Sequence, residues 1–163
     1  MNQEKRIQKF ELMSMDRLHE LAVSKFNKSI VLRDLYRDGY DNVMAKCISC
    51  EVKIVISTSY DLGRVCAGHY FLSDRYASVR FDRDNVNLQC NQKCNRQLSG
   101  NLSKYKIGLI EKIGEERFEL LEIKHNQIFK PTWKFLVDMI FESEEISKQR
   151  IKELRLEPLK IRI

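Results

Sequence analysis

The chain has 163 residues, of which 43% are hydrophobic and 32% charged, with a formal net charge of +6 at pH 7. This composition supports one domain, or one small core with helical additions, and excludes a disordered tail. No apolar run approaches the roughly 20 residues of a bilayer-spanning helix, and the first ten residues lack the apolar stretch of a secretory signal. The sequence therefore predicts neither a membrane protein nor an exported one.

The predicted elements begin with a polar, charged stretch of about a dozen residues, which we expect to be frayed or loosely docked. From about residue 15 to residue 38, apolar residues recur at helical spacing, with Ser14 as the N-cap and Gly39 as the C-terminal stop. This pattern predicts one long amphipathic helix that leads into the first cysteine pair.

The next segment is rich in β-forming residues. VKIVIS (52–57) and RVCAGHYF (64–71) are separated by TSYDLG, whose Asp61 and Gly63 suit a turn. A hairpin is the simplest interpretation. SVRF (78–81) is a candidate for another short extended piece.

The last third of the chain predicts helices again. Their predicted ranges are 95–101 (ended by Gly100), 102–113 (ended by Gly114), 115–124, and 132–154 with Thr132 as the N-cap. The final segment, LRLEPLKIRI, packs as a short arm or stays mobile. The sequence thus predicts an α+β protein with an N-terminal helical segment (1–46), a central core (47–114) and a C-terminal helical segment (115–163).

Five cysteines carry the clearest chemical signal. Cys47 and Cys50 have two residues between them, and Cys90 and Cys94 have three. In a reducing compartment, two such pairs can supply the four thiolates of a tetrahedral structural zinc site. The alternative is that they are small buried hydrophobic residues. Two pairs, with Cys66 left over, favour zinc.

Histidine and asparagine side chains surround the second pair. His69 lies at the end of a predicted strand, Asn85 and Asn87 precede the pair, and Asn95 follows it directly. With zinc as the scaffold, a neutral histidine and a hard divalent ion could form a ββα-metal nuclease centre. The alternatives are a hydrogen-bonded structural histidine, turn-forming asparagines and an asparagine that starts a helix. A further alternative joins Cys66 and His69 in a second knuckle, with six zinc ligands and no catalysis.

The strings CISC, AGHY and VRFDRDNVNLQCNQKCNRQLSGNLSKYKIGLIEKIG together resemble the NinG family of lambdoid phages, also called Rap. The resemblance covers about residues 18–125, weakly also the C-terminal helix, and is strongest over 79–114. It implies a zinc-stapled, HNH-like core of treble-clef type flanked by long helices. It also implies a structure-specific endonuclease that cuts branched recombination intermediates, Holliday junctions and D-loops among them, with Mg²⁺ or Mn²⁺.

Carried over to this chain, the resemblance makes His69 the general base, Asn85 the residue that holds the loop and orients the histidine, and Asn95 the ligand of the catalytic ion. The structural zinc ligands would be Cys47, Cys50, Cys90 and Cys94. The implied location is the cytoplasm of a bacterial host, with a phage or prophage as the source. Phage or host recombination proteins are further implied partners.

The chain departs from the family pattern at several positions. Cys66 stands where an acidic residue commonly precedes AGH, and a soft thiol is a poor ligand for Mg²⁺. The second knuckle has three intervening residues instead of two, and Asn87 occupies a position that is often histidine. The segment between Cys50 and His69 is also longer than usual. These departures support an alternative function, a zinc-dependent branched-DNA-binding accessory protein without catalysis.

The basic charge raises the expectation of a nucleic-acid partner, with a solvated basic surface as the alternative. It also disfavours a third function, a protein-interaction module. Branched DNA is recognised through its backbone, so we expect phosphate contacts around the zinc and the histidine strand. The candidate residues are Arg75, Arg80, Arg96, Lys104 and Lys106. Symmetric junction cutting also predicts a homodimer, with the two long helices either at the interface or packed on each other within one chain.

Overall fold

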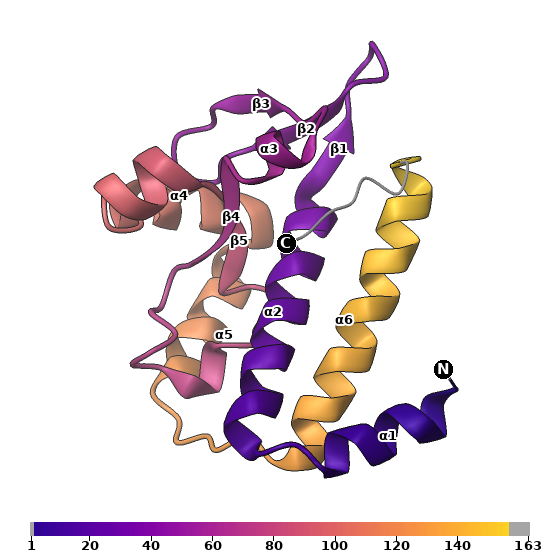
Figure 1. Ribbon diagram of the computed structural model, residues 1–163. Helices are drawn as coiled ribbons and strands as arrows, with labels where there is room; N and C mark the ends of the chain where they lie inside the picture. Colours follow the sequence, from indigo (N-terminus) through magenta and orange to yellow (C-terminus); the bar gives the residue numbers. More distant parts are fainter. Residues whose placement is uncertain (1, 157–163) are drawn as a thin grey trace.

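The computed structural model describes residues 2–156 (Figure 1). Its α-helices are α1 (Gln3–Glu11), α2 (Met15–Asp34), α3 (Ser59–Leu62), α4 (Leu102–Ile113), α5 (Glu115–His125) and α6 (Trp133–Glu153). Its strands are β1 (Leu35–Arg37), β2 (Val43–Lys46), β3 (Lys53–Val55), β4 (Val65–His69) and β5 (Val86–Cys90). Two short segments complete the fold, a 3₁₀ turn η1 (Ala77–Val79) and a π-helical segment η2 (Asn91–Gln97). The predicted α+β class is confirmed.

The strands form two small antiparallel sheets. One has the order β1-β2-β3, and the other is the hairpin β4-β5, in which His69 lies opposite Val86. The predicted hairpin between residues 52–57 and 64–71 is therefore wrong, because these two strands belong to different sheets. The intervening TSYDLG forms α3, since Thr58 and Asp61 make a capping box that stabilises a helical turn.

The two long helices pack on each other within the chain. Figure 1 shows α2 (indigo) and α6 (orange to yellow) side by side. The predicted caps Ser14 and Thr132 are confirmed, because each side chain accepts a backbone N–H of the first helical turn. The first helix ends at Asp34 instead of residue 38, because Leu35 adopts an extended conformation and pairs with Ala45 as the start of β1.

Two predicted local structures are replaced by others. The polar N-terminal stretch forms α1, and Asn2 is its N-cap. Helix α1 buries Phe10 against α6, and the indole of Trp133 donates a hydrogen bond to the Phe10 carbonyl. SVRF is not extended: its first two residues lie in the 3₁₀ turn η1, which Arg80 caps, and Val79 is fully buried. In both cases a few buried apolar side chains outweigh the local polar or β-rich pattern.

The later helices follow the sequence closely. The structure confirms α4 and α5 and their separation at Gly114, whose φ of +82° favours glycine. The helical segment predicted at 95–101 begins earlier, at Asn91, because η2 starts directly after β5. The proposed C-terminal arm falls mostly on residues 157–163, outside the described part of the chain. The three-part division at residues 47 and 115 stays a prediction.

The hairpin β4-β5 lies between α2 and α4. Side chains alternate along a strand, so Ala67 and His69 face the α2 side, while Cys66 and Gly68 face the α4 side. The approach on the α4 side is close, because a Cβ at Gly68 would lie 2.6 Å from a side-chain oxygen of Gln89 and would force that side chain to shift. The hairpin is therefore held on both faces.

Helix α4 also packs closely against the first cysteine loop. A Cβ at Gly108 would lie only 2.2 Å from the carbonyl oxygen of Ile48, so this position admits no larger residue without a shift of the backbone. A second tie comes from Gln89, whose amide donates to the Ser49 hydroxyl (2.6 Å) and to the Gly100 carbonyl (2.5 Å).

None of the helices within residues 2–156 has both the length and the apolar character needed to span a bilayer.

Candidate metal centre and histidine strand

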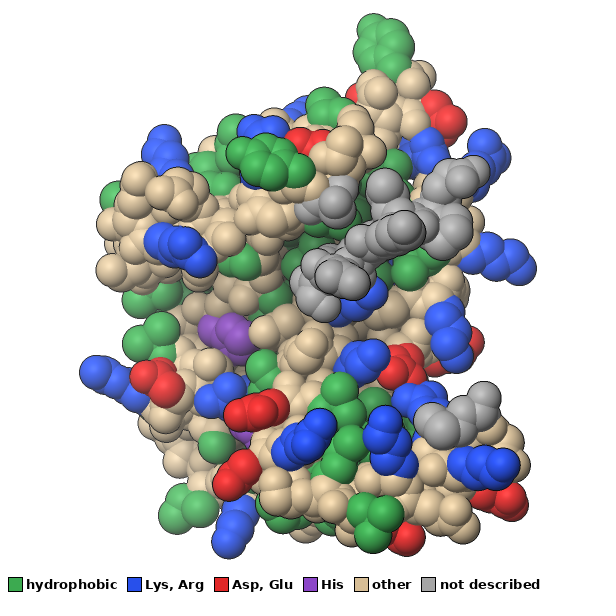
Figure 2. Space-filling model, viewed as in Figure 1, with side chains coloured by type: hydrophobic (Ala, Val, Ile, Leu, Met, Phe, Trp, Pro, Cys, Tyr) green, Lys and Arg blue, Asp and Glu red, His purple; other side chains and the backbone are tan. Residues whose placement is uncertain are grey.

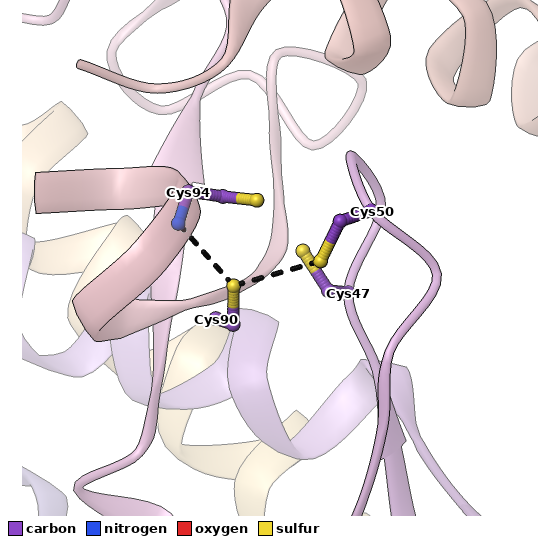
Figure 3. Close-up of side chains that lie close together, drawn as sticks. All are labelled: Cys47, Cys50, Cys90 and Cys94. Carbon is purple, nitrogen blue, oxygen red and sulfur yellow. Dashed lines mark hydrogen bonds between the residues drawn. The ribbon is translucent and has the colours of Figure 1, made fainter. Parts of the chain in front are cut away.

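The four cysteines predicted as zinc ligands lie together. The β2–β3 loop supplies Cys47 and Cys50, Cys90 ends β5, and Cys94 lies in η2 (Figure 3). Their sulfur atoms all lie within 4.8 Å of one another, and those of Cys50 and Cys90 are 3.8 Å apart. Sulfur atoms about 3.8 Å apart are what a tetrahedral zinc with Zn–S distances of about 2.3 Å requires. The residues therefore fit a structural zinc ion.

The surroundings of the sulfurs also suit a bound cation. Burial raises the pKa of the Cys90 thiol, and the neighbouring Cys47 raises it further, because thiolates side by side repel one another. The Cys94 backbone N–H donates to the Cys90 sulfur (3.3 Å), and the Asn101 amide donates to the Cys94 sulfur (3.5 Å). A divalent cation among the sulfurs would remove the repulsion and leave these donors in place.

Cys66 and His69 lie outside this cluster. In the described part of the chain, the four cysteines are the only group of three or more His, Cys, Asp and Glu side chains placed to hold a metal ion. The thiol of Cys66 instead donates to the Gln89 carbonyl (3.6 Å), and burial raises its pKa to about 12. The six-ligand knuckle is therefore not the arrangement that the fold assembles.

His69 is held at the end of β4. Its Nε2 lies 3.3 Å from the carbonyl oxygen of Arg80. Burial lowers the pKa of His69 to about 4; hydrogen bonds to the backbone of Arg80 and Ala67 oppose this shift, while the charge of Arg80 adds to it. The imidazole is therefore neutral at pH 7, the state in which it can accept a proton.

Asn85 closes the loop that follows the histidine. Its side-chain oxygen accepts the Phe71 N–H (2.7 Å), and its amide donates to the carbonyls of Phe71 and Val79, at 3.0 Å each. The side chain is fully buried. It fixes the two ends of the loop, which leaves His69 and Arg80 facing each other, without itself contacting the imidazole.

The sequence analysis missed a buried polar network on the other side of the hairpin. The Asp34 carboxylate accepts from Arg33, from Lys112 (2.8 Å) and from the Leu88 N–H (2.9 Å). The Asn87 oxygen also accepts from Lys112 (2.7 Å). Burial alone would raise the pKa of Asp34, but the hydrogen bonds and charges of its two cationic partners lower it. The sequence held no signal for this network, because it predicts a helix to residue 38 and so places Asp34 inside the helix, with nothing to indicate its distant partners.

Asn95 is half-buried in η2, which packs against both β4 and β5. The two side chains that the family resemblance assigns to a catalytic ion or to the position before AGH are the Asn95 amide and the thiol of Cys66, and neither is a carboxylate. These donors do not fit a hard divalent ion, which prefers several oxygen ligands with one or more carboxylates among them. The carboxylate that the family resemblance implies here is replaced by sulfur.

The five predicted DNA contacts fall in two places. Arg75 and Arg80 lie in the loop beside His69, and the Arg80 guanidinium donates to the Ser73 carbonyl (2.6 Å). The others, on η2 and α4, are exposed: Arg96, Lys104 and Lys106. Lys106 also lies 4.9 Å above the Phe118 ring, and Lys104 lines a hollow of about 560 Å³ next to Cys50. Their contact with DNA stays a prediction.

The chain matches the family model described as "Bacteriophage Lambda NinG protein" over residues 1–157. The chain belongs to the NinG family. The NinG proteins of Escherichia phage 933W and Escherichia phage lambda are each 33% identical to it over 109 residues, or 67% of this chain and 48% and 47% of the relatives. NinG of Salmonella phage P22 is 37% identical over 81 residues, half of this chain and 36% of the relative.

The chain thus matches less than half the length of these NinG relatives. No solved structure gives a significant match. The predicted family is confirmed by these comparisons, whereas nuclease activity and the HNH-like details stay predictions.

Proposed function

We propose that this NinG-family protein is a structure-specific endonuclease that hydrolyses phosphodiester bonds in branched recombination intermediates. The observation that carries the proposal is the four-cysteine site, which ties the β2–β3 loop to the end of β5 in the histidine hairpin and to η2. In a ββα-metal arrangement, this tie would hold a base and a phosphate-binding helix at a fixed distance. The hairpin alone is too small to maintain that distance.

His69 is the proposed base, and its neutral state at pH 7 suits that role. It would accept a proton from a water molecule that attacks the phosphorus, while Arg80 stands beside the scissile phosphate. The Arg80 carbonyl accepts from Nε2 at 3.3 Å, so this contact must open and the ring proton must move to Nδ1 before Nε2 can accept a proton from the water. We assign no step to a protein-held Mg²⁺ or Mn²⁺, because Asn95 and Cys66, the residues at the positions implied for it, do not fit one.

The second candidate function is a zinc-dependent protein that binds branched DNA without cutting it, as a homodimer or with other recombination proteins. The sulfur of Cys66 favours it, since this thiol replaces the hard ligand that a catalytic ion would need. Both functions share the zinc scaffold and the basic surface, and they differ only in cleavage.

Cleavage of a four-way junction, compared with linear duplex of the same sequence, tests the proposal. Wild type and His69→Ala would be incubated with Mg²⁺ or Mn²⁺, and the zinc content and junction affinity of both would be measured. Junction cutting that disappears in the variant, with zinc and binding retained, supports the nuclease. Binding without cutting by the wild type would reject the nuclease in favour of the second candidate.

A further inference from the structure

A basic groove lies between α1 and α2, away from all the DNA contacts considered so far. Figure 2 shows Lys and Arg side chains gathered over the lower part of the molecule, where Figure 1 places α1, α2 and the adjoining part of α6. The groove has a volume of about 350 Å³. Its lining combines cations, apolar side chains and a single carboxylate: Arg6, Lys9, Arg17, Lys25, Phe10, Met13, Leu21 and Glu144.

The cations outnumber the acidic groups that could neutralise them. Arg6 (2.6 Å) and Lys25 (3.0 Å) both contact Glu144. Burial alone would raise the pKa of this carboxyl, but the hydrogen bonds and charges of its two partners lower it, so it carries its full charge at pH 7. Among residues 2–156, no carboxylate forms an ion pair with Lys9 or Arg17. The groove lining therefore carries four cations against one anion.

The helix pattern extends this excess along α2. Arg17, Leu21, Lys25 and Lys28 follow one another at spacings of three or four residues and therefore share one face of the helix. Burial lowers the pKa of Lys28, the positive charge of Lys25 lowers it further, and the negative charge of Glu144 opposes the shift. A row of cations along one helix face suits an extended polyanion better than one small anion.

This face of α2 is separate from the histidine strand. His19, on the other side of the helix, lies 5.7 Å from the Phe81 ring, next to Arg80 and the end of β4. One helix thus stands between the two basic regions. A single straight duplex contacts one of them most easily, whereas two arms that meet at a branch can lie on both.

We propose that the α1–α2 groove binds the sugar-phosphate backbone of a second duplex arm, while a first arm lies at the histidine strand. The inference rests on the proposed function in that it takes branched DNA as the substrate. It goes further in naming a second surface and its partner. Contacts there are with phosphates, so they add affinity and branch preference without reading base sequence.

The test replaces Lys9, Arg17 and Lys28 by glutamine, which leaves the Arg6 and Lys25 contacts with Glu144 in place. The matched control removes the same charge from exposed positions elsewhere, at Lys53, Lys130 and Lys152. Binding of a labelled four-way junction and of linear duplex would be titrated at several salt concentrations. Circular dichroism and zinc content would show that each variant is folded.

We expect the groove variant to bind the junction roughly tenfold more weakly. The slope of log affinity against log salt concentration should become shallower, by an amount that corresponds to the loss of up to about three phosphate contacts. Its duplex affinity, and its cutting of saturated junction if the wild type cuts, should change little. An unchanged junction affinity and salt slope would overturn the inference, as would an equal loss in the control variant. Binding of vesicles of anionic lipid at the groove, with no effect of the variant on DNA, would also overturn it. A wild type that binds no DNA at all would instead reject the proposed function.

Discussion

The phenol of Tyr105 donates a hydrogen bond of 2.8 Å to the carbonyl of Gly68, the residue directly before His69. Tyr105 is fully buried in α4, and its oxygen also lies 3.3 Å from the Asn85 carbonyl and accepts from the Asn87 amide at 3.3 Å. A helix that follows the cysteine site thereby holds the end of the histidine strand directly. The position of His69 depends on α4 as well as on its own hairpin.

Tyr105→Phe removes this hydroxyl and keeps the ring. We expect the free energy of unfolding to fall by about 1–3 kcal/mol, because buried carbonyls lose their donor. Urea unfolding, followed by circular dichroism, measures the change. The control is Tyr40→Phe, since Tyr40 is 90% exposed and should change the stability by less than about 0.5 kcal/mol. Equal stabilities of Tyr105→Phe and wild type would contradict the prediction.

Removal of the metal ligand Cys94 tests the cysteine site. Purified wild type should contain one zinc per chain, and Cys94→Ser should contain none. The variant should also lose most of its cooperative unfolding transition, because the free energy of zinc binding by such sites is comparable to the free energy of unfolding of a small domain. Elemental analysis and thermal unfolding provide the two measurements.

The matched control for the zinc site is Cys66→Ser, which changes the one cysteine outside the cluster. It should keep a full zinc content and unfold as the wild type does to within about 1–2 kcal/mol. Loss of zinc from this control would restore the knuckle of Cys66 and His69 as the true ligand arrangement.

Asp34→Asn tests the buried network at the end of α2. At pH 7 we expect a loss of roughly 2–4 kcal/mol, because the charges of Arg33 and Lys112 lose their partner. The pKa of Asp34 is lowered below its usual 3.8, so its stabilisation is complete above about pH 4 and disappears only as the pH falls further.

Chemical unfolding of wild type and Asp34→Asn at pH 7, 5 and 3 would measure this dependence. The two proteins should differ equally at pH 7 and 5 and become more similar at pH 3. Asp138→Asn is the control, because Asp138 pairs with Lys134 on an exposed helix face and should change stability by less than about 1 kcal/mol. A constant difference at all three values would mean that the carboxylate charge is not what stabilises the network.

His69 makes a second pH-dependent contribution. Its pKa is about 4 in the folded protein against 6.5 in the unfolded chain, so the unfolded state binds a proton first as the pH falls. Stability from this residue is therefore complete above about pH 6.5 and declines by up to roughly 3 kcal/mol towards pH 4. His69→Gln should lack this decline. NMR titration of the imidazole measures the pKa directly, and a value near 6.5 would show that the ring is solvated.

Local signals in the sequence predicted the elements whose ends are set by single residues. Ser14, Thr132 and Gly114 act within one turn of the helix they begin or end, so their effect needs no knowledge of distant contacts. The four-cysteine cluster was predictable for a related reason, since a metal site requires a fixed set of ligands at short spacings.

The sequence did not reveal contacts between distant segments. The pairing of β4 with β5 instead of β3 depends on fitting the hairpin between α2 and α4, and the network of Asp34 joins residues more than fifty positions apart. The charge pattern of α2 was visible in the sequence, but the groove beside α1 was not, because the N-terminal stretch is too polar to predict a docked helix.

The contact of Gly108 with Ile48 and the tie made by Gln89 have a consequence for the metal itself. They join the cysteine loop, α4 and the histidine hairpin, so zinc bound by the four cysteines would be linked to the geometry of the hairpin. Such linkage is reciprocal. A molecule that binds only the ordered hairpin would raise the affinity for zinc, and zinc would raise the affinity for that molecule by the same factor. Zinc release measured with and without DNA would therefore report on binding at a distance from the metal.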